Sequence, residues 1–336
     1  MVNPFDLTML KKIKSSQIEM PAHLGAFPKA LPVYGVDHPS LKNEDPRINW
    51  EMRVKFLKDV FGFEGSLDDA GDRLVLQDKE GNRVVQIYKA SDSFLYYDRR
   101  IATPTDPQFA SKILDHDTAK SNAHEWLAKY GLGDQCSFFE GMAYTGVSTA
   151  QISEDTKYQS NYAEKEYHTE IKPCFGFRIN ETDVLGSGAK IMLSFAGNEI
   201  SQVVYFWRRP VSKPIGDIAI LPPEIIKKHL ARDHRFAHLD PNNSKIRINS
   251  IKLGYHAASP ADFQRVYLPV YQFTGIVETR GGHNAQGFES QVKKKGSFVQ
   301  EALQYHFNYF LSATSLTPSQ YKLSGFQLPK NGSFIF

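Results

Sequence analysis

The chain has 336 residues, of which 41% are hydrophobic and 23% charged, with a formal net charge of +3 at pH 7. This composition predicts a soluble globular protein and excludes collagen-like, disordered and disulfide-dense chains. With 40 basic and 37 acidic residues, the net charge gives no indication of a nucleic-acid partner. No apolar run approaches the roughly 20 residues of a membrane-spanning helix, so no transmembrane segment is expected.

The N-terminal region is rich in proline, and we expect a short helix over residues 7–18 followed by an extended arm up to residue 45. A second helix is expected over residues 49–61, because apolar residues recur there at three- and four-residue spacing before Gly62. Alternating apolar residues, with a glycine-containing turn between the first two runs, then predict three strands. These strands cover residues 73–77, 83–88 and 94–98.

The order of a helix followed by strands then returns twice. Asp117 suits the N-cap of a helix over residues 117–130, and Gly131 suits its C-terminal end. The strands expected after it cover residues 136–145, 166–171, 174–179, 189–195 and 200–207, with a hairpin turn at 196–199. The last round consists of a helix over 222–232, strands over 245–256 and 265–278, and a C-terminal helix over 298–311 before an aromatic tail.

This organisation predicts an α+β fold made of repeated helix-plus-antiparallel-sheet units, with the helices packed on one face of curved sheets. It argues against a doubly wound parallel fold, which requires strict alternation of strands and helices. The expected divisions are an N-terminal arm (1–45), a first helix-plus-meander unit (46–110), a second unit (111–213) and a third unit with the C-terminal helix and aromatic tail (214–336).

The second unit resembles a PepSY-like repeat. The resemblance is carried by the segment FRINETDVLGSGAKI at residues 177–191, the Gly197-Asn198 turn and the aromatic strand that ends at Trp207. Similar features return at residues 253–255 and 268–271. The pattern is similar to two-repeat bacterial regulatory proteins of the YycH/YycI type, over about residues 115–280. The resemblance implies cystatin-like curved sheets and a role in binding and regulation, and it assigns no functional residue.

The strand Glu166-Tyr167-His168-Thr169-Glu170 holds the clearest acid–base grouping. Because side chains alternate along a strand, Glu166, His168 and Glu170 are expected on one side, where the carboxylates can orient the imidazole and raise its pKa for proton transfer. The alternative is a polar, water-facing side of the sheet. The signatures of dinucleotide binding, P-loops, classical zinc sites and α/β-hydrolases do not occur, so we expect no cofactor and no metal.

Two further groups are candidates for ligand binding. In Arg280-Gly281-Gly282-His283, the glycines allow backbone N–H groups to converge on an anion while Arg280 and His283 add charge; a plain flexible loop is the alternative. The second group consists of Tyr205 and Trp207. Aromatic residues make up 12% of the chain, and these two side chains are expected either to line a binding groove or to fill the core.

Three classes of function follow. We favour a non-catalytic binding or regulatory protein that presents a sheet-lined groove to a peptide, protein or small molecule. The alternatives are a cofactor-independent isomerase, cyclase or hydrolase that uses the Glu-His-Glu group, and a structural or assembly protein that docks through the aromatic tail.

Cys136 and Cys174 are expected to be buried thiols, with a disulfide as the alternative. The N-terminus lacks a signal-peptide pattern, which favours the cytoplasm; the oligomeric state stays open.

Overall fold

The structure is a computed structural model that describes residues 13–22, 25–38, 46–102, 113–133, 143–154, 165–231, 236, 239, 244–279 and 303–314. For residues 46–49, 102, 143–154, 165–169, 303–305 and 307, only the backbone is described. The helical elements are η2 (Ser15–Gln17), α1 (Pro46–Phe61), α2 (Arg99–Ala102), α3 (His116–Lys129) and α4 (Pro223–Leu230).

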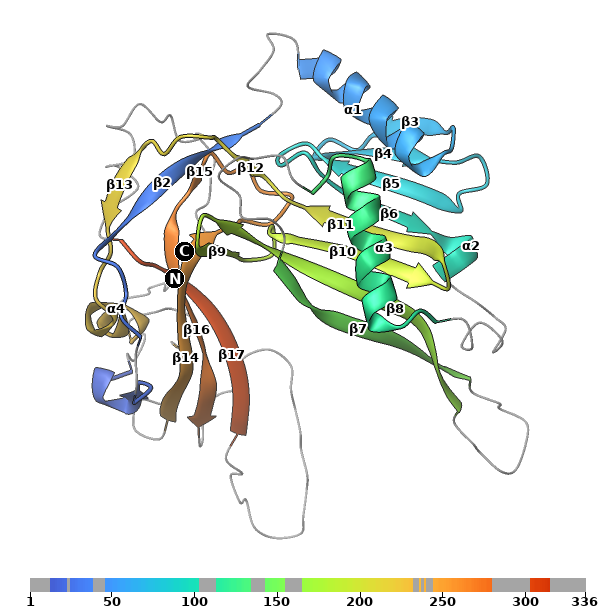
Figure 1. The fold of residues 1–336 in the computed structure, drawn as a ribbon. Coiled ribbons are helices and arrows are strands. Elements are labelled where there is room, and N and C mark those ends of the chain that lie inside the picture. Colours follow the sequence, from blue (N-terminus) through green and yellow to red (C-terminus); the bar gives the residue numbers. More distant parts are fainter. Residues whose placement is uncertain are drawn as a thin grey trace, which may run out of the picture.

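Strands dominate the fold (Figure 1). The strands of the first half are β1 (Ile18–Glu19), β2 (Ala30–Asp37), β3 (Ser66–Asp69), β4 (Arg73–Gln77), β5 (Arg83–Tyr88), β6 (Ser93–Asp98), β7 (Ala143–Glu154) and β8 (Lys165–Ile179). Those of the second half are β9 (Thr182–Leu185), β10 (Lys190–Ala196), β11 (Glu199–Phe206), β12 (Arg209–Pro210), β13 (Gly216–Ala219), β14 (Ser244–His256), β15 (Val266–Tyr267), β16 (Pro269–Thr279) and β17 (Leu303–Ser312).

The described strands form two sheets. The larger has 13 strands in the order β17-β16-β14-β9-β8-β10-β11-β6-β5-β4-β3, with β1 added beside β14 and β7 beside β8. All its pairs are antiparallel except β1 with β14 and β9 with β14. The smaller sheet places β2 beside β12, β13 and β15. The fold is therefore a mixed, sheet-dominated arrangement of α and β elements.

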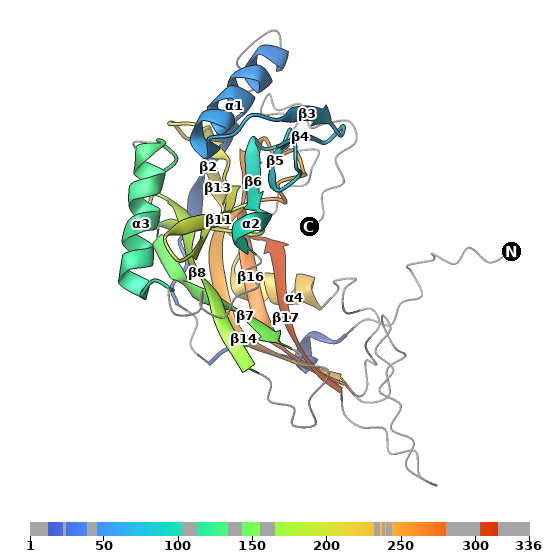
Figure 2. The ribbon, with the colours of Figure 1, turned by 90° about the vertical axis from the view of Figure 1, so that its right-hand side faces the viewer.

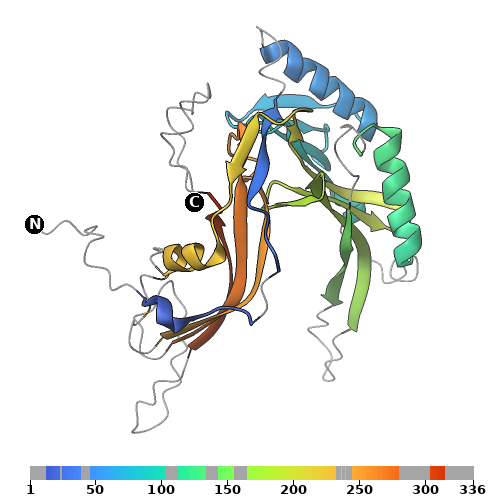
Figure 3. The same ribbon diagram turned by 60° about the vertical axis from the view of Figure 1, so that its left-hand side comes forward.

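The larger sheet bends into two arms (Figure 3). The large arm consists of β3–β8, β10 and β11, and the small arm of β14, β16 and β17. Helices α1 and α3 lie on the outer side of the large arm, and Figure 2 shows α3 alongside β8 and β11. Helix α4 lies on the outer side of the small arm.

Each arm has its own core. In the large arm, Leu57 of α1 and Leu127 of α3 are fully buried against apolar strand residues such as Val85 and Leu193. In the small arm, Ile226 and Leu230 of α4 pack against β14 and β16. Burial of these faces is the main source of stability, since each fully buried Leu or Ile side chain contributes about 1.5–3 kcal/mol.

Local sequence signals predicted many of these elements. The strands expected at 73–77 and 83–88 have the observed bounds, and the third one starts a residue earlier. Helices α1, α3 and α4 are present, and Gly62 and Gly131 adopt the positive φ values of 61° that terminate helices. The N-cap of α3 is Asp115 rather than the expected Asp117, because Asp115 accepts a hydrogen bond from the backbone N–H of Thr118.

Three expectations about elements were wrong. The C-terminal helix over 298–311 is replaced by strand β17, which pairs with β16 over its whole length. The helix expected to reach residue 18 is replaced by the short turn η2 and by β1, while residues 1–12 lie outside the described part. The strands expected at 166–171 and 174–179 are one continuous strand, β8. The N-terminal arm, expected to be extended, contains β2 of the smaller sheet.

Along the chain, α1 precedes β3–β6, α3 precedes β7–β12, and α4 follows β13 and precedes β14–β17. Apart from β12 and β15, which belong to the smaller sheet, the strands of all three stretches join the larger sheet. None of the described helices is long and apolar enough to span a bilayer.

Candidate functional site

Glu170 is the only member of the Glu-His-Glu group whose side chain is described, and it is 6% exposed. Its Oε1 accepts a hydrogen bond from the Ser201 hydroxyl, and its Oε2 lies 2.9 Å from Nζ of Lys172. Both carboxylate oxygens are therefore occupied by side chains of the sheet itself. The contact with Ser201 links β8 to β11 across β10, and the β10–β11 pairing contains a bulge between Ser194 and Phe195.

Glu166 and His168 lie on the same strand, β8, and only their backbone is described. His168 pairs with Gln151 and Glu170 pairs with Ala150, so two steps along β8 correspond to one step along β7. This register shift interrupts the strict alternation on which the expected common side of the three residues depends. The proton-transfer role of the group stays a prediction.

The other sequence candidates have different outcomes. Arg280, Gly281, Gly282 and His283 lie outside the described residues, so the anion loop stays a prediction. Tyr205 and Trp207 are 4% and 7% exposed and belong to the core of the large arm. Tyr205 stacks on Phe94 with ring centroids 5.0 Å apart, and Trp207 stacks on Phe177 at 3.7 Å. The alternative of core packing therefore describes these two rings.

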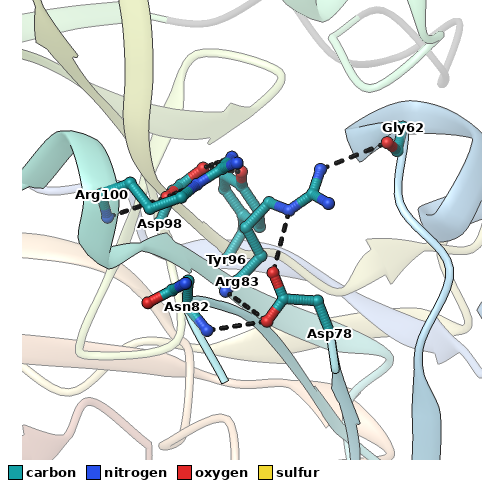
Figure 4. A network of polar contacts seen from close by, with 7 residues as sticks. All are labelled: Gly62, Asp78, Asn82, Arg83, Tyr96, Asp98 and Arg100. Carbon is teal, nitrogen blue, oxygen red and sulfur yellow. Dashed lines mark hydrogen bonds and ion pairs between the residues drawn. The ribbon is translucent and has the colours of Figure 1, made fainter. Parts of the chain in front are cut away.

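A polar network joins the β4–β5 turn to the end of β6 (Figure 4). Asp78 Oδ1 accepts hydrogen bonds from the backbone N–H groups of Asn82 and Arg83, and its Oδ2 accepts one from Arg83 Nε at 3.2 Å. Asp98, which is 1% exposed, accepts hydrogen bonds from Nε and Nη2 of Arg100 at 3.0 and 2.6 Å. Each aspartate thus has its own arginine.

The electrostatics of this network suit a structural role. Burial disfavours the charge of Asp98, but the hydrogen bonds from Arg100 outweigh it and hold the pKa of Asp98 below its ordinary value. The pKa of Asp78 is lowered in the same way by Arg83. Burial, together with Asp98, raises the pKa of Tyr96. None of these shifts brings the pKa of a group toward neutral pH, where an acid–base catalyst operates.

Within the described part of the chain, no three His, Cys, Asp or Glu side chains are grouped to hold a metal ion.

The inner face of the large arm, opposite α1 and α3, carries a different arrangement, which we call the cation–aromatic row. It consists of Arg73, Tyr88, Ser93, Phe206 and Lys190. Direct cross-strand pairing places Arg73 beside Tyr88, Tyr88 beside Ser93, and Phe206 beside Lys190. Since directly paired residues share a face of the sheet, the row crosses β4, β5, β6, β11 and β10 on one side.

The side chains of the row contact one another. The rings of Tyr88 and Phe206 meet edge to face, with centroids 5.8 Å apart, across the small side chain of Ser93. The guanidinium of Arg73 lies 5.5 Å from the Tyr88 centroid, and Nζ of Lys190 lies 5.6 Å from that of Phe206. Two aromatic rings are thus flanked by a cation at each end, within the distance at which cation–π attraction operates.

Beside this row runs a second, mainly apolar one, formed by Val75, Gln86, Leu95, Val204, Met192 and Cys174. All of these residues except Val204 are half-buried. Burial raises the pKa of the Cys174 thiol, against the attraction of Lys190 and Lys172. Among the described helices, none lies over this face, so it combines apolar surface with a margin of basic and aromatic groups (Figure 3).

Sequence reasoning missed the cation–aromatic row because its members are spread over residues 73–206. The register of the two hairpins was the signal that could have predicted part of the row. Arg73 pairs with Tyr88 at the open end of the β4–β5 hairpin, and Lys190 pairs with Phe206 at the open end of the β10–β11 hairpin. The contact between the two hairpins through β6 and β11 is not a local feature of the sequence.

Comparisons with known proteins add a structural similarity and no functional one. No family model matches the chain, and no curated protein matches it. The crystal structure of an uncharacterized protein from Eubacterium rectale ATCC 33656 aligns with 89% of this chain and 88% of that one, with 11% sequence identity and a TM-score of 0.46. The function is therefore inferred from the geometry of this chain alone.

Proposed function

We propose that this protein is a non-catalytic binding protein that uses the inner face of the large arm. The observation that carries the proposal is the cation–aromatic row, in which Tyr88 and Phe206 form a half-buried aromatic surface between Arg73 and Lys190. Core rings such as Phe94 also contact a basic side chain, but Phe94 is fully buried, whereas Tyr88 and Phe206 keep part of their surface exposed. A surface that combines rings and cations suits recognition, because rings supply contact area and cations supply orientation.

The charges indicate what kind of ligand fits. Arg73 is occupied by the Asp72 carboxylate, with Nε and Nη2 3.0 and 3.1 Å from its two oxygens. Lys190 is exposed and forms no ion pair with any described acidic residue. The ligand class that complements this surface is therefore one with a flat or apolar body, placed over Phe206 and the apolar row, and an anionic group beside Lys190.

A regulatory role of the PepSY-like kind is the finer form of this proposal. It is supported by the order of helix before strands in residues 46–98 and 116–210. A protein of this kind binds a peptide or another protein, which agrees with an extended sheet face rather than a deep acid–base centre.

The proposal is tested with 8-anilinonaphthalene-1-sulfonate, a fluorescent probe that combines aromatic rings with a sulfonate. We expect saturable binding, and we expect Lys190→Glu and Phe206→Ala each to weaken the affinity by about fivefold or more, which corresponds to roughly 1 kcal/mol of lost cation–π and apolar contact. Lys213→Glu, at an exposed position of the loop after β12, and Met52→Ala, on the outer surface of α1, are the matched controls. If all four variants bind the probe as tightly as the unmodified chain, the inner face is not the binding surface.

A further inference from the structure

The last strand of the larger sheet offers a second surface. β17 (Leu303–Ser312) pairs along one edge with β16, from Leu303↔Thr279 to Ser312↔Val270. It is the terminal strand in the order of the sheet, and among the described strands nothing pairs with its other edge. The backbone N–H and C=O groups of alternate residues of this ten-residue strand point to that edge, and they can therefore accept another extended chain.

The sequence of β17, LQYHFNYFLS, contains no Lys, Arg, Asp, Glu, Pro or Gly. Natural proteins protect exposed edge strands from pairing with charged residues, especially Lys, with Pro, or with bulges. The pairing of β17 with β16 runs without a register shift, so no bulge twists this edge away. An edge that is long, regular and uncharged is suited to pairing with another strand.

The order of residues in β17 indicates which chain pairs there. Reading the odd positions gives Leu303, Tyr305, Phe307, Tyr309 and Leu311, an order that is identical in both directions around Phe307. Two copies of the strand running antiparallel, with a two-fold axis at Phe307, would therefore place identical residue types in equivalent environments. Such self-complementarity is what a two-fold symmetric interface requires.

We propose that two copies of this chain associate through antiparallel pairing of their β17 edges, centred on Phe307, so that the two large sheets become continuous. In this register Tyr305 pairs with Tyr309 of the second copy, and His306 pairs with Asn308. His306 and Asn308 are both exposed in the single chain, and Asn308 Oδ1 accepts a hydrogen bond from Gln272 Nε2 at 3.0 Å. One pair of strands is a small interface, so the dimer forms in the micromolar range and depends on concentration.

The register predicts a pair of variants that differ in one residue. The double variant His306→Lys with Asn308→Lys puts lysine opposite lysine at two symmetric positions, which destabilises the strand pair. The double variant His306→Lys with Asn308→Glu puts lysine opposite glutamate at the same positions. Both variants carry two substitutions at the same exposed sites, and circular dichroism establishes that both are folded.

Sedimentation equilibrium of the full chain from about 1 to 100 µM measures the outcome. We expect the unmodified chain and the Lys/Glu variant to approach twice the chain mass of 38.1 kDa, and the Lys/Lys variant to stay at that mass. Hydrogen exchange of the β17 amides is expected to slow with concentration in the first two proteins only. A chain that is monomeric throughout, or a Lys/Lys variant that dimerises as the unmodified chain does, overturns the proposal. Neither result bears on the probe binding of the inner face.

Discussion

The indole of Trp207 lies flat on the phenyl ring of Phe177, with ring centroids 3.7 Å apart and planes 4° from parallel. The pair joins β8 to the end of β11, two strands that are separated in the sheet by β10. Both side chains are less than 10% exposed, so the contact belongs to the core of the large arm.

Replacing Trp207 by Ala is therefore expected to lower the free energy of unfolding by about 3–5 kcal/mol, since a large buried ring is removed and a cavity is left. Urea denaturation followed by circular dichroism measures the change. Met52→Ala, at a position that is 66% exposed, is the control and should stay within about 0.5 kcal/mol. A small loss at Trp207 would mean that the ring is not a core residue and would return it to the candidates for ligand binding.

Asp98→Asn is expected to lower the free energy of unfolding at pH 7 by about 1–3 kcal/mol, because the charge-assisted hydrogen bonds with Arg100 are weakened at a buried position. The pKa of Asp98 is depressed in the folded protein. Its stabilising contribution is therefore complete above the ordinary aspartate pKa of about 3.9 and is lost as the pH falls through the lower, folded value.

The difference in stability between the unmodified chain and Asp98→Asn should consequently shrink below about pH 4. Urea titrations at neutral and acidic pH measure it. Asp68→Asn, on the exposed strand β3, is the matched control and should change little. A difference that grows on acidification contradicts the depressed pKa.

His38 gives a pH dependence in another range. The imidazole is 2% exposed, its Nε2 lies 2.9 Å from the carbonyl oxygen of Lys89, and burial lowers its pKa below the ordinary 6.5. As the pH falls below 6.5, the unfolded chain binds a proton that the folded chain does not, so stability decreases by up to about 1.4 kcal/mol per pH unit until the folded pKa is reached.

His38→Gln removes this titration while it keeps a donor for the carbonyl group. We expect the stability of the variant to fall less between pH 7 and pH 5 than that of the unmodified chain, as measured by thermal unfolding at each pH. His116→Gln, at the exposed start of α3, serves as the control. Equal pH dependence in all three proteins would show that His38 is readily protonated in the folded state.

Gly188 lies where two distant segments meet. A Cβ atom at this position would overlap the carbonyl oxygen of Ala258 and lie 2.6 Å from Nη1 of Arg208. Arg208 is 1% exposed, and its Nη1 donates a hydrogen bond to the same carbonyl at 2.8 Å. Gly188→Ala is therefore expected to cost about 1–3 kcal/mol, because the backbone or the arginine must shift.

Gly216→Ala is the matched control for this prediction, since a Cβ there meets nothing within 4 Å. It should be close to neutral in chemical denaturation. Equal stabilities of the two variants would indicate that the Arg208 contact does not hold the loop at Ala258 in solution.

Strand β17 shows how a local pattern can be misread. Residues 298–311 contain enough aromatic side chains to supply a helical face, but residues 303–309 alternate strictly between apolar and polar types, which is the strand period. The exposed His306 and Asn308 agree with that alternation. Pairing with β16 then fixes the strand, since tertiary contacts override weak helical preferences.

The candidate sites were harder to predict than the helices and strands, because they also depend on tertiary contacts. Sequence spacing could single out Glu170, but it could not supply Ser201, which lies 31 residues further on and occupies one carboxylate oxygen. Nor could it place the ring of Trp207 on Phe177. Spacing predicts which residues share a strand face, whereas function depends on what the neighbouring strand brings to that face.

Helical periodicity, alternation and turn glycines act over a few residues, so they predicted the positions of α1, α3, α4 and of the β4–β5 and β10–β11 hairpins. Tertiary structure alone decided that β6 pairs with β11 and β14 with β9. Those long-range pairings set which side chains lie side by side, because a register fixes the face and the neighbours of every residue in a strand. The cation–aromatic row and the terminal place of β17 among the described strands both result from those pairings.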